Sequence, residues 1–151
     1  MVKAPILFQI EAYGIALFDT NILVYAHDRD AGDKHVRAID LLARLAHSRE
    51  LTISAQVLNE LANVLLRKRK LDRALVATAV AMMSARAIVL PLTGELTALA
   101  LGPGMDAGLS FWDALVWATA HANRIGVVYT EDFTHDRVVG GVRFVDPFRS
   151  S

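Results

Sequence analysis

Short apolar runs rich in β-branched residues alternate along this chain with longer segments of helical period, and this alternation restricts its fold most. Strands are predicted at residues 14–18, 51–53, 87–90, 127–130 and 142–145. Helices are predicted at residues 34–49, 55–68, 73–85, 94–101 and 111–124, the last four after the N-cap residues Ser54, Asp72, Thr93 and Ser110. Strands that alternate with helices form a parallel sheet with helices on both faces. We therefore expect an α/β fold with three layers, α/β/α, around a central, mostly parallel sheet of about five strands.

The apolar residues of two predicted helices indicate which of their faces are buried. In helix 34–49 the inward-facing positions are Ile39, Leu41, Leu42, Leu45 and Ala46. Helix 73–85 is more apolar than one buried stripe requires, through Leu75, Val76, Ala79, Val80, Met82 and Met83. Either most of these residues pack in the core, or part of this helix is an exposed interaction surface.

The chain has 151 residues, enough for one globular domain with its own core. We expect this domain to span residues 13–151, after an extension of unknown role at residues 1–12. Lys3 and the apolar residues after it faintly resemble a signal peptide, but Glu11 ends that run too early. The longest stretch without a charged residue, 74–85, is shorter than the ~20 residues that cross a bilayer. We therefore expect a cytoplasmic protein without a transmembrane helix.

Composition excludes several classes of site. Cysteine is absent, which rules out a disulfide framework, Cys-ligated zinc, iron–sulfur clusters and thiol catalysis. The 16 Lys and Arg residues balance 16 Asp and Glu residues, which argues against nucleic-acid binding through bulk positive charge. A local basic run remains at Arg67, Lys68, Arg69, Lys70 and Arg73. It is either the solvated end of a helix or, through its first four residues, a contact for RNA phosphates.

Two acidic residues follow predicted strands directly. Asp19 comes after the strand at 14–18, and Asp132 comes two residues after Thr130. Open parallel sheets bind ligands at the carboxyl ends of their strands. Each residue could also be an N-cap or could form an Asx-turn.

Two more acidic residues lie on predicted helices, close to apolar faces. Glu60 follows Val57 by three residues, so its carboxylate borders the buried side of helix 55–68. Asp113 shares an apolar helix face with Val116 and with residues 117 and 120. A lone buried carboxylate there would be costly. Ser110 and Asp113 also have the spacing of a capping box, which is the alternative interpretation.

All four acids could meet in one crevice at the edge of the sheet. Clustered carboxylates repel one another unless a cation compensates them, and an all-oxygen site suits Mg²⁺ or Mn²⁺. Such a site can activate water and stabilise the charge on a phosphodiester. The sequence therefore predicts a divalent metal site.

The residues around the four acids form recognisable motifs. They are Phe18-Asp19-Thr20-Asn21-Ile22-Leu23-Val24-Tyr25-Ala26, Val57-Leu58-Asn59-Glu60-Leu61, Ser110-Phe111-Trp112-Asp113-Ala114-Leu115 and Tyr129-Thr130-Glu131-Asp132-Phe133. In this order they resemble the motifs of PIN-domain nucleases, and most of all those of the VapC-type toxins of toxin–antitoxin pairs. The resemblance runs from about Ile15 to Phe148 and implies a PIN-like fold.

The resemblance also implies a function. It makes Asp19, Glu60, Asp113 and Asp132 the catalytic residues and the ligands of Mg²⁺ or Mn²⁺ in an endoribonuclease that hydrolyses RNA. The resemblance also implies that Thr20, Asn21 and Thr130 are polar residues that support the metal ligands. The choice of Asp132 over its neighbour Glu131 follows the family's Thr-x-Asp spacing alone. The implied partners are the RNA substrate, a second copy in a homodimer, and a cognate antitoxin that covers an apolar groove and fills the active site.

Other functions fit the sequence less well. The alternative from another class is a catalytically silent PIN-like module that binds RNA or protein, but such a module is expected to have lost part of the acidic set. The histidines lack His-Glu-x-x-His spacing, and phosphate-loop and Gly-x-Ser-x-Gly motifs are absent. A calcium loop beginning at Asp28 would require Gly at the position of Asp33. A receiver-type signalling domain would require adjacent acids after the first strand.

Overall fold

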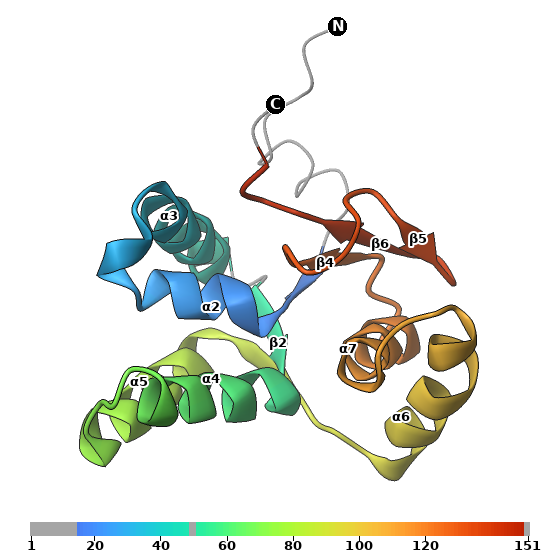
Figure 1. Cartoon of the computed structure of the whole chain (residues 1–151), viewed down its shortest axis with the longest axis horizontal. Coiled ribbons are helices and arrows are strands. Elements are labelled where there is room, and N and C mark those ends of the chain that lie inside the picture. The colour runs from blue at the N-terminus through green and yellow to red at the C-terminus, as the bar shows by residue number, and fades with distance from the viewer. Residues whose placement is uncertain (1–14, 49–50, 150–151) are drawn as a thin grey trace, which may run out of the picture. The chain divides into compact units, whose positions relative to one another are not determined.

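The computed structural model describes residues 15–48 and 51–149 (Figure 1). These residues fall into two compact units, Phe18–Pro91 and a second unit made of the residues before Phe18 together with those from Leu92 onwards. The expected extension at residues 1–12 lies outside the described residues, so it stays a prediction, as do the domain bounds. In the part of the chain that is described, no helix is long and apolar enough to cross a membrane.

The unit Phe18–Pro91 has two parallel strands and four α-helices. Strands β2 (Leu51–Ser54) and β3 (Ile88–Leu90) pair with Thr52 opposite Ile88 and Ser54 opposite Leu90. The helices are α2 (Thr20–Ala26), α3 (Asp33–Ser48), α4 (Ala55–Arg67) and α5 (Arg73–Arg86). Helix α2 packs on α3 and α4, and α4 packs on α5 (Figure 1).

The predicted N-caps of this unit are confirmed. The Ser54 side chain accepts a hydrogen bond from the backbone N–H of Val57 at the start of α4, and Asp72 accepts from Ala74 at the start of α5. Each cap satisfies one of the donors that the first turn of a helix leaves without a partner. The N-cap residues therefore predict where these two helices begin.

Helix α2 and one side of α3 differ from the prediction. Helix α2 was not predicted, because its seven residues are too short to show a helical period. In α3 the buried residues are Ala38, Leu41, Leu42 and Leu45. Ile39 is 45% exposed, so its predicted inward position is wrong, and Ala46 is only half-buried. Both line a cavity described below.

The second unit contains most of the remaining sheet. Strand β1 (Ala16–Phe18) ends at the boundary between the units and is fully buried. Strand β6 (Val142–Val145) pairs in parallel with β4 (Val127–Tyr129) and antiparallel with the two-residue strand β5 (Val138–Val139). Strand β5 was not predicted. It brings the described strands to six, with β3 beside β2 in one unit and the order β4-β6-β5 in the other.

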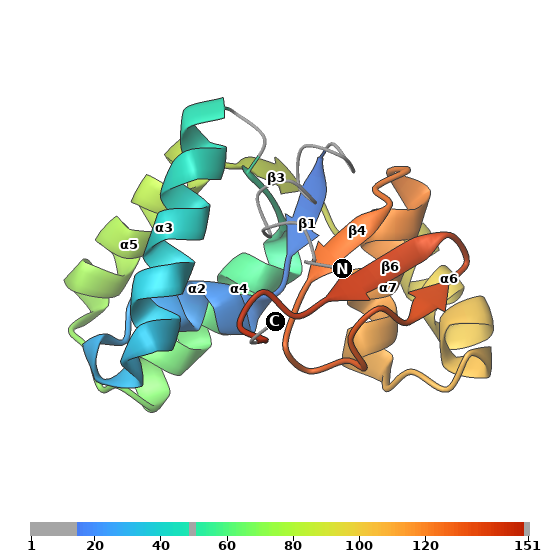
Figure 2. The same cartoon turned by 90° about the horizontal axis from the view of Figure 1, so that it is seen from above.

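Helix α7 (Phe111–Ala122) forms the core of the second unit. Its residues 114–120 are all buried, and it contacts β4, β6 and helix α6 (Gly94–Leu99) (Figure 2). The helix predicted to end at residue 101 is followed by a kink, because the backbone of Gly102 is non-helical, with φ −88° and ψ −105°. A Cβ atom on Gly104 would lie 2.9 Å from the Ala114 Cβ, so this close approach to α7 requires glycine.

Candidate active site

Asp19 and Glu60 lie on either side of Thr20 in the unit Phe18–Pro91. Asp19 is 6% exposed and caps α2, with its Oδ1 atom accepting a 2.7 Å hydrogen bond from the Thr20 backbone N–H. The Thr20 hydroxyl donates a 2.7 Å hydrogen bond to Oε2 of Glu60. Helix α2 therefore brings the first predicted acid and the second, on α4, into one neighbourhood. The N-cap interpretation of Asp19 and its position beside Glu60 both hold.

Glu60 has a second partner, which the sequence analysis missed. Gln56, one helical turn earlier on α4, donates from Nε2 to Oε1 of Glu60 at 2.8 Å. Gln56 is 3% exposed, whereas Glu60 is half-buried. Both carboxylate oxygens thus accept a hydrogen bond from a side chain, which fixes the orientation of the group. The i, i+4 spacing of two polar residues beside a buried helix face was the available signal.

Asp113 and Asp132 belong to the second unit. The backbone N–H of Asp113 donates to the Ser110 hydroxyl at 3.3 Å, so Ser110 is the N-cap of α7 as predicted. Asp113 itself is half-buried instead of lying among the buried residues of α7. Asp132 is exposed, and its backbone N–H donates to Oγ1 of the buried Thr130 at 3.2 Å. The turn after β4 therefore uses the Thr130 hydroxyl, not the Asp132 carboxylate.

The four acids are divided between the units, two in each. Within residues 15–48 and 51–149, no group of three or more histidine or acidic side chains lies close enough to hold a metal ion. The structure thus gives the local setting of each acid. The convergence of all four on one metal stays a prediction.

The basic run lies exposed at the end of α4. Arg67 is the last residue of this helix, and Lys68 is its C-cap. The Arg69 guanidinium forms an ion pair with Asp28, in the segment after α2. Arg69 therefore ties the end of α4 to a neighbouring loop, while the role predicted for this run in RNA binding stays a prediction.

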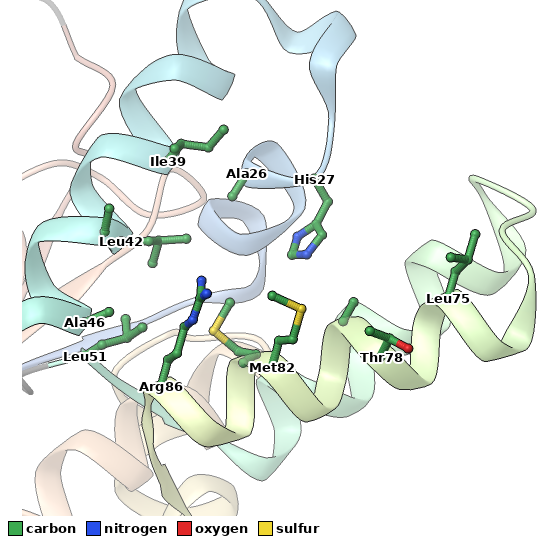
Figure 3. A pocket seen from close by; sticks show the side chains of 13 residues that line it. Ala26, His27, Ile39, Leu42, Ala46, Leu51, Leu75, Thr78, Met82 and Arg86 are labelled. Atoms are coloured by element: carbon green, nitrogen blue, oxygen red, sulfur yellow. The ribbon is translucent and has the colours of Figure 1, made fainter.

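An apolar cavity of about 420 Å³ lies within the unit Phe18–Pro91, between α3 and α5. Ile39, Leu42 and Ala46 of α3 line one side, and Leu75, Thr78, Ala79, Met82 and Met83 of α5 line the other (Figure 3). Figure 3 shows the Arg86 side chain extending from α5 into this space. We call this surface the α3–α5 groove.

The groove decides between the two interpretations of α5. Val76 is the only buried residue of that helix, whereas Leu75 is 61% exposed and Met82 is 49% exposed. The apolar surplus of α5 therefore faces outward over the groove, and core packing accounts for little of it. Exposed apolar surface of this kind is typical of protein interaction sites.

Comparison with known proteins identifies the fold. The family model of the PIN domain matches residues 16–141. No curated protein sequence is significantly similar to the chain.

Three solved structures resemble the chain over most of its length. VapBC2 from Rickettsia felis, bound to a DNA fragment from its promoter, is 18% identical, with a TM-score of 0.65 over 87% of this chain and 97% of its own. A toxin–antitoxin complex from Klebsiella pneumoniae is 21% identical, with a TM-score of 0.66 over 89% and 99%. VapC20 from Mycobacterium tuberculosis, described as a toxin that cleaves the sarcin–ricin loop, is 25% identical, with a TM-score of 0.61 over 85% and 98%.

These matches confirm the expected α/β fold class and the resemblance to VapC-type toxins. The matched span begins in β1 and includes Asp19, Glu60, Asp113 and Asp132. The chain belongs to the PIN domain family.

Proposed function

We propose that this protein is a metal-dependent endoribonuclease toxin that hydrolyses RNA phosphodiester bonds and is neutralised by a cognate antitoxin. The observation that carries the proposal is the pair Asp19 and Glu60, joined through Thr20 in a chain that matches the PIN domain. The structural similarity to VapC20, described as a cleaving toxin, supports the nuclease assignment. The toxin–antitoxin complexes among the similar structures support the partner.

The proposed ligands of the metal are Asp19, Glu60, Asp113 and Asp132. The donor set fits Mg²⁺ or Mn²⁺, because both ions prefer carboxylate oxygens. The half-buried Glu60, with both oxygens accepting hydrogen bonds, is held in one orientation, as a ligand must be. When bound, the ion supplies charge stabilisation at phosphorus and a more acidic water.

The neighbouring residues of the chain orient this donor set. Thr20 links Asp19 to Glu60 through its backbone N–H and its hydroxyl. Gln56 holds the other Glu60 oxygen, and Thr130 shapes the turn that carries Asp132. Asn21, half-buried in α2, completes the polar support. We assign contacts with RNA phosphates to Arg67, Lys68 and Lys70, with Arg69 serving mainly its ion pair with Asp28.

The α3–α5 groove is the proposed docking site for the antitoxin. Its apolar lining suits the apolar side of a helix, and Arg86 offers a partner for a carboxylate on that helix. We also propose that the toxin is a homodimer and acts in the cytoplasm.

Cleavage of end-labelled single-stranded RNA tests the proposed function. The purified protein is incubated with Mg²⁺, Mn²⁺ or EDTA, and Asp113→Asn controls for a contaminating nuclease. Cleavage that requires the metal and is lost in the variant supports the proposal. Equal cleavage by both proteins, or failure to cut a varied RNA pool once any antitoxin has been removed, contradicts it and favours a binding module.

A further inference from the structure

The loop between β4 and β5, which carries Asp132, is fastened to β6. The Phe133 ring stacks on Phe144, with centroids 4.0 Å apart and planes at 2°. The backbone N–H of Asp136 donates to the Phe144 carbonyl at 2.8 Å, and the Phe144 N–H donates to the Arg137 carbonyl at 2.9 Å. These contacts hold the part of the loop that follows Asp132.

His135 makes two further contacts in this loop. Its Nδ1 atom accepts a 3.2 Å hydrogen bond from the backbone N–H of Asp146, just after β6. A ring nitrogen that accepts carries no proton, so the proton of the neutral ring is on Nε2. Nε2 lies 3.3 Å from Oδ2 of Asp136, so this ring nitrogen is close to the carboxylate of the next residue.

Asp136 depends on such contacts, because its backbone is strained. Its φ of 64° lies in the left-handed region, which costs free energy for a non-glycine residue, although aspartate adopts it more often than most. His135 approaches one oxygen of Asp136, and Nη1 of Arg143 on β6 lies 3.5 Å from the other. His135 thus links the strained end of the loop to the residue that follows β6.

We infer that His135 is a positioning residue, which holds the loop so that Asp132 is presented in one orientation to the metal. This inference rests on the proposed function of Asp132 as a metal ligand. The physical reason is the difference in burial between Asp132 and His135. Asp132 is exposed, and the loop on its N-terminal side is held by the hydrogen bond of its N–H to Thr130 Oγ1 and by that of the Thr130 N–H to the Val145 carbonyl, so His135 belongs to the contacts that hold the C-terminal side. His135 has only 16% of its side chain exposed and makes the contact that joins this loop to Asp146.

Binding of Mn²⁺ alone, measured by isothermal titration calorimetry, tests the inference without RNA or activity. The His135→Ala variant is expected to bind Mn²⁺ about 10-fold more weakly, the usual effect of removing a group that orients a ligand. His135→Asn keeps an acceptor near the Nδ1 position, so we expect it to recover most of the affinity. His135→Gln keeps a polar group near the position of Nε2 but loses the acceptor for the Asp146 N–H, and we expect it to bind as weakly as His135→Ala.

His121→Ala is the matched control. The Nδ1 atom of His121 also bonds to the backbone of this unit, at the Gly140 carbonyl at 3.0 Å, but away from the Asp132 loop. Its Mn²⁺ affinity should stay at the wild-type value, while urea unfolding compares the stability of all variants. If His135→Ala does not fold, the difference between His135→Asn and His135→Gln carries the test.

The outcomes separate this inference from the proposed function. Wild-type affinity in His135→Ala and His135→Gln, or an equal loss in His121→Ala, overturns the positioning role and leaves the metal site standing. Absence of Mn²⁺ binding in the wild-type protein, or unchanged binding in Asp132→Asn, overturns the proposed role of Asp132 and the inference with it.

Discussion

The Thr20 hydroxyl donates a 2.7 Å hydrogen bond to Oε2 of Glu60, across 40 residues of sequence. The same residue donates its backbone N–H to Asp19. One threonine therefore sets the orientation of two acids that come from different elements. The backbone N–H of Thr20 takes part in the cap of α2, and its hydroxyl makes the long-range contact with Glu60. The start of α2 therefore contributes both to the fold and to the proposed site.

Thr20→Val should weaken Mn²⁺ binding about 10-fold, because Oε2 of Glu60 loses the donor that orients it. The free energy of unfolding should fall by about 1 kcal/mol, since Glu60 is only half-buried and water can replace part of the bond. Thr20→Ser keeps the hydroxyl and should bind the metal normally. Calorimetry and urea unfolding measure the two effects. Normal metal binding by Thr20→Val would refute this role for the hydroxyl.

Gln56→Leu should lower kcat for RNA cleavage more than it changes KM. The substitution removes the donor to Oε1 of Glu60 but leaves the surface available to RNA unchanged, since Gln56 is buried. Asn59→Leu is the control, because Asn59 is exposed on α4 beside Glu60. Steady-state kinetics on a short RNA distinguishes them. A comparable loss of kcat in both variants would mean that Gln56 has no specific effect on Glu60.

The double variant Lys68→Ala with Lys70→Ala should reduce the salt dependence of RNA binding. If both side chains contact phosphates, the slope of log K against log salt should fall by about 1.4, at roughly 0.7 per phosphate for a single strand. Arg69→Ala should leave that slope nearly unchanged, because its guanidinium pairs with Asp28. Binding titrations with catalytically inactive protein at several salt concentrations give the slopes. An unchanged slope in the double variant would exclude these two lysines as phosphate contacts.

Met82→Glu should prevent capture of the antitoxin while leaving RNA cleavage intact. A carboxylate at this position would enter the apolar lining of the α3–α5 groove and would be costly to bury against a partner. Ala81→Glu adds the same charge to α5 at an exposed position outside the lining. Co-expression with the antitoxin, followed by affinity purification, measures capture. Antitoxin retained by Met82→Glu and Ala81→Glu alike would place its docking site elsewhere.

Tryptophan fluorescence should report RNA binding next to Asp113. The chain has two tryptophans, of which Trp112 is 61% exposed and Trp117 is 3% exposed with Nε1 bonded to the Val139 carbonyl. Bases stack on exposed aromatic rings, so RNA should quench Trp112 in the Asp113→Asn background. Trp112→Phe should remove most of this signal. Quenching that survives in Trp112→Phe would show that RNA does not approach this ring.

The candidate site itself was only partly predictable from sequence. Its four acids could be predicted because carboxylates at strand ends and beside apolar helix faces are costly unless they are capped, paired or bound to a cation. Gln56 did not stand out, since a glutamine on a helix is ordinary until its burial and its bond to Glu60 are seen. The contact of His135 with Asp146 likewise joins residues whose approach depends on how β6 pairs with its neighbours.

The sequence by itself determined five of the strands and the five longer helices in their order, the caps at Ser54, Asp72, Thr93 and Ser110, and the family to which the chain belongs, but not α2 or β5. The elements and caps depend on residues within a few positions of each other, and the family on short motifs in a fixed order, so periodicity and side-chain chemistry reveal them. Only the tertiary structure decided that Thr20 and Gln56 together hold Glu60, that Arg69 pairs with Asp28, and that the apolar surplus of α5 opens into a groove. The physical reason is that helix packing sets contacts between elements and decides which apolar positions are left uncovered.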